Sequence, residues 1–358
     1  MLYYFYSGFL FGLYCLLLEI FKVERKLTLL MPALISMAFF VGLREFHIGT
    51  DTLSYIEIYS YMPSIDEYLT NFQTGYHGNR MEWGFFILLS ILKGLSFPPN
   101  LMLIAISLGS LVTLAIAYRR ICPNYYLGVF IFTVSILFLT LQYNILRQGL
   151  ATSFVILAFS NLIEKKKGYY LFFSLIAVSF HVIALVSFLI YPLKSFKWQR
   201  NYFILIVLAF IGFGLVDVLA TLVFQLRNVN IAFWRVFLYL QNSSDQLSIF
   251  SWMLISTIVL ILLCVFFVRD IRAKFPYIDI IITYTVIGML CMLLTRELSM
   301  LSLRIGYMFF AVEPILVMAL LTLIKNEIPK FIAIFVFATL ILSKNIFITA
   351  QFLSPYSY

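Results

Sequence analysis

A short polar run between two apolar stretches holds the residue with the clearest chemical potential. Residues 142–148 join the two stretches with almost no loop, so the sequence predicts Arg147 in the first turn of a helix at membrane depth. An arginine at that depth is costly unless it faces a cavity or an anion. The N–H groups and the dipole of a helix N-terminus also favour an anion. We therefore predict that Arg147 and its neighbour Gln148 bind an anionic group.

The longest polar stretch, residues 44–82, holds a second set of such residues. Arg44 and Asp51 flank Gly49, which permits a tight turn. Two roles are open for Asp51. It can cap the helix that follows, or its carboxylate can bind a hydroxyl group and take its proton.

A third set lies in the C-terminal third of the chain. Arg304 is predicted to open the span Ile305–Ile324, and Arg296 precedes Glu297, with which it can form a local ion pair. Glu313 lies nine residues after Arg304, inside that span. An acid at such depth indicates either a function or a partner for one of the arginines.

A histidine lies in the middle of an apolar stretch. His181 is near the centre of Tyr169–Leu193. At neutral pH a histidine can take a proton from a hydroxyl group, but a lone histidine in a membrane is as often a buried hydrogen-bond partner. Both roles stay open for His181.

The composition requires a membrane around the elements that position these residues. The chain has 358 residues, of which 63% are hydrophobic and 11% charged, and its mean hydropathy is +1.01. Soluble domains have about 25% charged residues. The sequence predicts an all-α, polytopic integral membrane protein with about 10–12 membrane segments, forming a single transmembrane domain over residues 1–358.

The four cysteines are scattered among apolar segments and predict neither a disulfide nor a zinc site. The candidate spans are Met1–Phe21, Leu27–Leu43, Leu101–Tyr118, Tyr125–Leu141, Leu146–Ile163, Tyr202–Phe224, Ile249–Val268, Tyr277–Leu294, Ile305–Ile324 and Phe331–Ala350.

Basic residues orient the chain, because cytoplasmic loops of membrane proteins carry the excess of Lys and Arg. With every basic cluster inside, residues 44–82 form the main extracytoplasmic loop, and Trp83–Leu95 does not cross the membrane fully. Tyr169–Leu193 then becomes a hairpin of two half-length pieces with His181 near its tip. In the competing topology both stretches cross once and two clusters lie outside. The clusters are Lys22/Arg25/Lys26, Arg119/Arg120, Lys165/Lys166/Lys167, Lys194/Lys197/Arg200, Arg269/Arg272/Lys274 and Lys325/Lys330.

The predicted outer segments carry arginine but no lysine. A planar guanidinium binds phosphate or carboxylate through two hydrogen bonds at once. The outer face is therefore predicted to hold an anion, with anchoring at the membrane interface as the alternative for any one residue. These arginines are Arg44, Arg80, Arg147, Arg227, Arg235, Arg296 and Arg304.

Together these pieces resemble the EpsG family of exopolysaccharide polymerases, a branch of the Wzy-type polymerases. Trp83 departs from the family pattern, which has proline or another residue there, and in the C-terminal third only an arginine and a tyrosine match. The matching residues, in family order, are Val41-Gly42-Leu43-Arg44, Gly49-Thr50-Asp51-Thr52, Tyr55, Glu82, Gly84, Arg147-Gln148-Gly149-Leu150-Ala151, Phe180-His181, Arg304 and Tyr307.

The resemblance implies a GT-C-like helical bundle in the bacterial cytoplasmic (inner) membrane. On its outer face the growing polysaccharide would leave its undecaprenyl pyrophosphate and move to the non-reducing-end hydroxyl of the next lipid-linked unit. Donor and acceptor would both be undecaprenyl-pyrophosphate-linked oligosaccharides. Membrane lipids, a chain-length regulator and a flippase are further expected partners, and nucleic acid is not. We expect no cofactor and no metal.

The implied reaction assigns roles to the residues above. A departing pyrophosphate develops charge that preorganised cations stabilise, and Arg147 and Arg304 are the first candidates for this role. Arg44 is next, and Asp51 and His181 are candidate bases for the acceptor hydroxyl. The other candidates for binding the substrate or its pyrophosphate are Gln148, Tyr307, Tyr55, Glu82 and Arg296.

Three other classes of protein remain as alternatives. A lipid-linked oligosaccharide ligase uses the same donor, but such ligases tend to have a larger outer loop than the short segment Gln225–Ser248. A transporter or flippase usually shows internal repeats, and none is evident. A scaffold without chemistry would leave the arginines at membrane depth as an unexplained cost.

Overall fold

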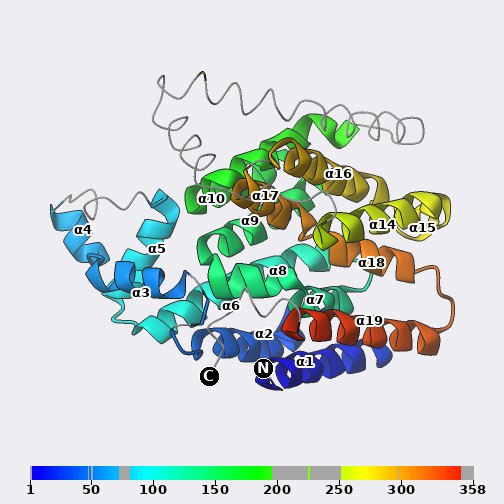
Figure 1. Cartoon of the computed structure of the whole chain (residues 1–358), viewed down its shortest axis with the longest axis horizontal. Helices are drawn as coiled ribbons and strands as arrows, with labels where there is room; N and C mark the ends of the chain where they lie inside the picture. Colours follow the sequence, from blue (N-terminus) through cyan, green and yellow to red (C-terminus); the bar gives the residue numbers. More distant parts are fainter. Residues whose placement is uncertain are drawn as a thin grey trace. The chain divides into compact units, whose positions relative to one another are not determined.

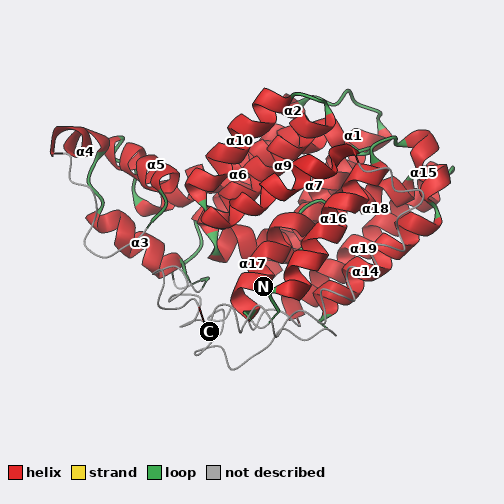
Figure 2. Ribbon diagram, turned by 90° about the horizontal axis from the view of Figure 1, so that it is seen from above, coloured by secondary structure: helices red, strands yellow, loops and turns green. Residues whose placement is uncertain are grey.

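The protein is all-helical over the residues that the structure describes, which confirms the predicted fold class (Figures 1 and 2). A computed structural model describes residues 2–46, 48–49, 51–71, 81–195, 225, 251–296 and 298–347. Its contacts divide the chain into two compact units. Unit 1 comprises Met1–Ser187 and Ile324–Tyr358, and unit 2 comprises Phe188–Leu323. The single transmembrane domain stays a prediction.

Unit 1 contains most of the helices that the structure describes. They are α1 (Leu2–Ile20), α2 (Leu27–Gly42), α3 (Thr52–Tyr61), α4 (Ile65–Asn71), α5 (Trp83–Gly94), α6 (Pro99–Ile121), α7 (Tyr125–Val134), α8 (Ile136–Leu139), the π-helical turn η1 (Thr140–Asn144), α9 (Leu146–Ile163), α10 (Lys167–Phe180), the 3₁₀ helix η2 (Val182–Ser195), which runs on into unit 2, and α19 (Glu327–Phe347). The helices in the described part of unit 2 are α14 (Trp252–Phe266), α15 (Val268–Lys274), α16 (Ile278–Leu294), α17 (Ser299–Phe310) and α18 (Glu313–Leu321).

Several described helices are long and apolar enough to cross a membrane. Three qualify by length and composition alone, namely Pro99–Ile121, Leu146–Ile163 and Ser299–Leu321. Two bent pairs raise the number to five if each pair is one span, and their bends are 65° after Val134 and 76° after Phe266. These findings support a membrane protein, whereas the total of 10–12 segments stays a prediction. The candidate span Tyr202–Phe224 lies outside the described residues.

One end of unit 1 carries basic clusters that were predicted to be cytoplasmic. Arg25 donates hydrogen bonds to the carbonyl oxygens of Cys122, at 3.3 Å, and Pro123. Arg120 donates to Asn161 Oδ1 at 2.9 Å. The loop between α1 and α2 therefore meets the C-terminal end of α6, which in turn lies beside the C-terminal end of α9.

The opposite end of unit 1 holds the predicted outer residues. A Cβ on Gly42, the last residue of α2, would lie 3.0 Å from the carbonyl oxygen of Asn100 at the start of α6. Arg44 donates to the carbonyl oxygen of Tyr143, just before α9, at 3.1 Å. The helices α2, α6 and α9 thus run between the two ends, and Arg44 and Arg147 share the end opposite the basic clusters. Figure 2 shows α6 and α9 side by side, with α10 next to α9.

Helix α5 begins and ends near the end of unit 1 that holds Arg44 and Arg147. Its second residue, Gly84, packs against Ser179 so closely that a Cβ would overlap the serine side chain. Near its other end, Lys93 Nζ donates to the carbonyl oxygens of Tyr59 and Ser60, at 3.3 and 3.1 Å. A helix of 12 residues is about 18 Å long, shorter than the hydrocarbon core of a bilayer. That Trp83–Leu95 does not cross the membrane stays a prediction.

The chain reverses direction at His181. Tyr170, near the start of α10, donates its hydroxyl hydrogen to the carbonyl oxygen of Ser187 in η2, at 2.9 Å. A straight continuation would separate these residues by far more than a hydrogen-bond distance. The predicted hairpin with His181 at its tip is therefore present, formed by two helices of 14 residues each.

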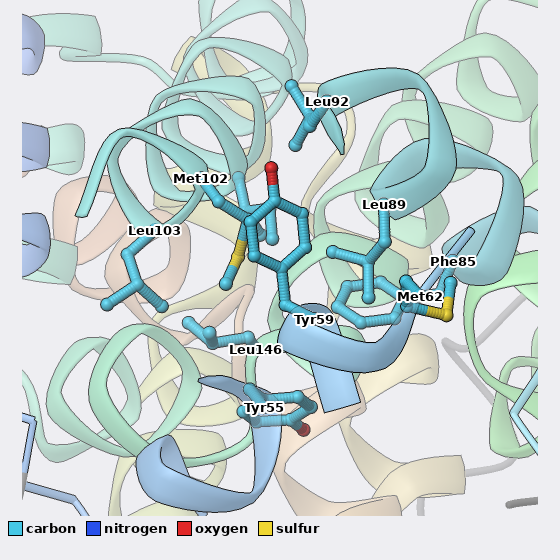
Figure 3. Packing of buried hydrophobic residues seen from close by; sticks show 10 residues of the cluster. Tyr55, Tyr59, Met62, Phe85, Leu89, Leu92, Met102, Leu103 and Leu146 are labelled. Atoms are coloured by element: carbon cyan, nitrogen blue, oxygen red, sulfur yellow. The ribbon is translucent and has the colours of Figure 1, made fainter. Parts of the chain in front are cut away.

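A buried apolar cluster fixes the short helices of residues 44–95 against α6. Figure 3 shows how Tyr55 and Tyr59 of α3 approach Phe85 and Leu89 of α5, together with residues of α6. Leu146, the residue immediately before Arg147, belongs to the same cluster. The packing therefore ties the predicted extracytoplasmic loop to the first turn of α9.

Unit 2 corrects the predicted place of Arg304. Helix α17 begins at Ser299, so Arg304 lies more than one turn inside the helix and does not open it. The prediction missed this because Ser299–Ser302 is less apolar than the run that follows. Glu313 begins α18, after a turn, and its carboxyl group is hydrogen-bonded to Thr257 of α14. A hydroxyl group is therefore one partner of this partly buried acid.

Candidate active site at the outer end of unit 1

Arg147, Glu82 and Tyr55 form the centre of the site. Arg147 is the second residue of α9, as predicted, and its Nη1 donates to Glu82 Oε2 at 2.6 Å. The Tyr55 hydroxyl is a further hydrogen-bond partner of the guanidinium. Arg147 Nε is buried without a hydrogen-bond partner among the described residues. The guanidinium therefore keeps donor capacity, next to a helix N-terminus that itself favours an anion.

Tyr55 is a neutral donor or acceptor in this cluster. Burial raises the pKa of its hydroxyl above the ordinary value, Arg147 opposes that shift, and the charge of Asp51 adds to it. A tyrosine with a raised pKa keeps its proton at physiological pH. Tyr55 can therefore accept from the guanidinium and donate to a bound oxygen.

Glu82 joins this cluster to the tip of the hairpin. Its Oε1 accepts a hydrogen bond from the backbone N–H of Val182, the residue after His181, at 3.3 Å. His181 is itself buried, and its Nδ1 accepts from the backbone N–H of Ile183 at 3.3 Å. A neutral imidazole that accepts at Nδ1 carries its hydrogen on Nε2. In that form His181 offers a donor, not a base, to a substrate.

Arg44 fixes the loop that contains it through several hydrogen bonds. The buried guanidinium donates to the carbonyl oxygens of Val41, Ile48 and Tyr143 and to Thr52 Oγ1, and it lies over the Tyr143 ring. Thr52 Oγ1 also lies 2.7 Å from the Ile48 carbonyl oxygen and 3.1 Å from that of Tyr143. Arg44 and Thr52 thus hold residues 44–52 against η1, which directly precedes α9. Arg44 therefore supports the position of Arg147.

Asp51 does not cap the helix that follows it. It is the residue before α3, but its side chain makes no capping hydrogen bond. The cap, one of the two roles that the sequence left open, is therefore absent. Asp51 lies one helical turn before Tyr55, whose backbone N–H donates to the Asp51 carbonyl oxygen at 3.1 Å, so its carboxylate is near the cluster.

Two glycines allow the close backbone approaches of the site. Gly49 has φ +90°, and a Cβ there would overlap the carbonyl oxygen of Tyr143. A Cβ on Gly149 would overlap the carbonyl oxygen of Leu141 in η1. Both glycines thus approach the backbone of η1 closely, and buried Gln148 lies between Arg147 and Gly149 in the chain.

Alanine at Gly49 should loosen this loop. A positive φ costs a non-glycine residue about 1–3 kcal/mol, and the overlap with Tyr143 adds to that cost. We expect a lower unfolding temperature for the Gly49→Ala protein. Gly168→Ala is the matched control, since a Cβ there meets no atom within 4 Å. Equal unfolding temperatures for the two variants would contradict the proposed role of Gly49.

The other predicted site residues lie in unit 2. Arg304 and Tyr307 are three residues apart on α17, so they share one face of the helix. Arg296 lies between α16 and α17, while its neighbour Glu297 is outside the described residues. Their roles stay predictions. Among the described residues no group of three His, Cys, Asp or Glu side chains could hold a metal ion, and metal independence also stays a prediction.

Comparison with known proteins identifies the family. The EpsG family model matches residues 27–358. The chain belongs to the EpsG family. This EpsG-family protein is also similar to the amylovoran biosynthesis protein AmsC of Erwinia amylovora, with 22% identity over 325 residues, which cover 90% of this chain and 86% of AmsC. No solved structure matches the chain.

Sequence reasoning missed several groups in this EpsG-family site. The carbonyl oxygen of Tyr143 and the backbone N–H of Val182 carry no side-chain signal, so only the fold reveals their roles. Thr52 follows Asp51 directly and was overlooked as a polar partner for Arg44. The family motif around Gly49 was the one signal that could have found it.

Proposed function

We propose that the protein is a Wzy-type glycosyltransferase that polymerises lipid-linked repeat units of an extracellular polysaccharide. The cluster of Arg147, Glu82, Tyr55 and His181 carries the proposal, because it joins three sequence motifs at one end of unit 1. Membership in the EpsG family and similarity to an amylovoran biosynthesis protein support it. The same proposal includes a GT-C-like bundle that crosses the bacterial cytoplasmic membrane several times.

In the proposed reaction both substrates are undecaprenyl-pyrophosphate-linked oligosaccharides. The hydroxyl oxygen at the non-reducing end of the incoming unit attacks C1 of the sugar at the reducing end of the growing chain. A new C1–O glycosidic bond forms as the C1–O bond to the pyrophosphate breaks. The electron pair of the broken bond leaves with the pyrophosphate, and the hydroxyl proton passes to a base.

Arg147 stabilises the departing pyrophosphate in this proposal. Its partly buried guanidinium and the N–H groups of the first turn of α9 supply fixed positive charge where negative charge develops. Gln148 and Tyr55 are proposed to contact the same anion. Arg304, Tyr307 and Arg296 are proposed to bind a lipid-linked substrate or its pyrophosphate, as the family resemblance implies.

Asp51 is the preferred base. A carboxylate near neutral Tyr55 can accept the proton of a sugar hydroxyl, whereas His181 in its neutral form presents a hydrogen on Nε2. His181 is then proposed to donate a hydrogen bond to a substrate oxygen. No cofactor or metal enters this scheme.

Deleting the gene in its native bacterium tests the proposal. Loss of long polysaccharide, with single repeat units accumulating on lipid at the outer face, is the expected result. A ligase would instead leave long lipid-linked polymer that is not transferred. A flippase would leave single units protected from a glycosidase added outside. Either of these two patterns would overturn the polymerase proposal.

A further inference from the structure

One carboxylate connects the two halves of the candidate site. Glu82 Oε2 accepts from Arg147 on α9, and Glu82 Oε1 accepts from the N–H of Val182 at the start of η2. The two oxygens therefore serve two different elements, and Glu82 itself precedes a third, α5. An ion pair formed only to neutralise Arg147 would not need the second contact.

The contact between Glu82 and the backbone N–H of Val182 also affects the position of His181. Val182 follows His181 directly, and the imidazole Nδ1 accepts from the next backbone N–H, that of Ile183. The ring orientation is thus set by the same turn of backbone that Glu82 holds. A shift of this turn would move the ring relative to the guanidinium.

Nearby packing prevents Glu82 from moving independently. Gly84, two residues later, lies directly against Ser179 near the end of α10. Phe85 is fully buried in the cluster that includes Tyr55 and Leu146 (Figure 3). The carboxylate is therefore carried by a backbone that is fixed against both α9 and α10.

We propose that Glu82 is a positioning residue that holds Arg147 and the His181 turn in one arrangement. The inference rests on the proposed function, because it gives these two residues a shared substrate. Glu82 then acts through them and does not itself bind pyrophosphate, in contrast to the binding role that the family resemblance implied for it. The ion pair is partly exposed, with the Arg147 and Glu82 side chains 28% and 19% accessible, so its effect on stability is expected to be small.

The test compares Glu82→Gln with Glu57→Ala, a control on an exposed acid of α3. Purified full-length proteins in lipid nanodiscs are measured for turnover, for binding of inorganic pyrophosphate and for the imidazole NMR signals of His181. The chain has three histidines, so a background with His47→Asn and His77→Asn leaves His181 as the single signal. Glutamine keeps the shape of the side chain but lacks the charge that holds Arg147.

Glu82→Gln is expected to change the His181 signals and to lower kcat by about 100-fold, the cost of a displacement near 1 Å at a reacting group. Pyrophosphate binding should weaken, and the Glu57→Ala protein should match the parent in all three measurements. Unchanged His181 signals in folded Glu82→Gln would overturn the inference. So would tighter pyrophosphate binding, because it would show that Glu82 competes for Arg147 instead of positioning it.

A failure of this inference can be distinguished from a failure of the proposed function. The NMR and binding measurements need no turnover, so they report on Glu82 even if the protein does not polymerise the substrate. If Glu82→Gln does not fold, Glu82→Asp replaces it, and faster hydrogen exchange in the peptide covering residues 181–187 is the expected result. Unchanged exchange there would overturn the positioning role while leaving the polymerase proposal intact.

Discussion

Replacing Arg147 with alanine should lower the turnover of polymerisation by about 10²- to 10³-fold, the usual cost of removing one preorganised donor from a developing oxyanion. The variant removes the guanidinium that Tyr55 and Glu82 hold at the N-terminus of α9. Turnover with purified lipid-linked repeat units, measured at saturating substrate, reports the effect on kcat directly.

Two further variants make the Arg147 result specific. Arg147→Lys keeps the charge but loses the planar fork, so its turnover should lie between that of the parent and that of Arg147→Ala. Arg119→Ala removes an exposed arginine from the opposite end of unit 1 and should leave turnover unchanged. Full activity of folded Arg147→Ala would remove this residue from the mechanism.

Arg44→Met should produce a large loss of stability. The substitution keeps an unbranched side chain but withdraws the donor from the carbonyl oxygens of Val41, Ile48 and Tyr143. The Thr52 hydroxyl has a single hydrogen to share between the carbonyl oxygens of Ile48 and Tyr143. Each buried acceptor that is then left without a donor costs about 1–3 kcal/mol. We expect a clearly lower unfolding temperature in detergent, with activity falling as the loop detaches from the start of α9.

This result separates a positioning role for Arg44 from the pyrophosphate-binding role implied by the family resemblance. If Arg44 contacted pyrophosphate directly, Arg44→Met would weaken pyrophosphate binding while the unfolding temperature stayed that of the parent. That outcome would contradict the positioning role of Arg44. Arg44→Lys should resemble Arg44→Met, because one ammonium group cannot reach three carbonyl oxygens on separate segments.

Local sequence signals were sufficient for some features of the fold. Arg147 follows a polar run with no room for a loop, so its place in a first helical turn could be predicted. The excess of basic residues at both ends of Tyr169–Leu193 predicted the reversal at His181, which the contact between Tyr170 and Ser187 demonstrates. Both predictions depend on charge and length, which are properties of the chain itself.

Other features depend on contacts between distant segments. The sequence predicted that Arg44 faces an anion, but one of the carbonyl oxygens that it binds, that of Tyr143, lies in η1, about 100 residues away in the chain. Helix α17 begins at Ser299, before the most apolar residues, and Ser302 in its first turn donates its hydroxyl hydrogen to the Met292 carbonyl oxygen of α16 at 2.7 Å. The bridge from Glu82 to Val182 uses a backbone group, which no side-chain pattern can reveal.

The most direct test of the central claim is polymerisation in vitro. The purified protein in lipid is given the undecaprenyl-pyrophosphate-linked repeat unit of its own polysaccharide, beside folded Arg147→Ala and Arg119→Ala variants. The account predicts a ladder of products spaced by one repeat unit from the parent and from Arg119→Ala, and its loss from Arg147→Ala. Absence of any ladder from a parent protein that binds the substrate would contradict the account.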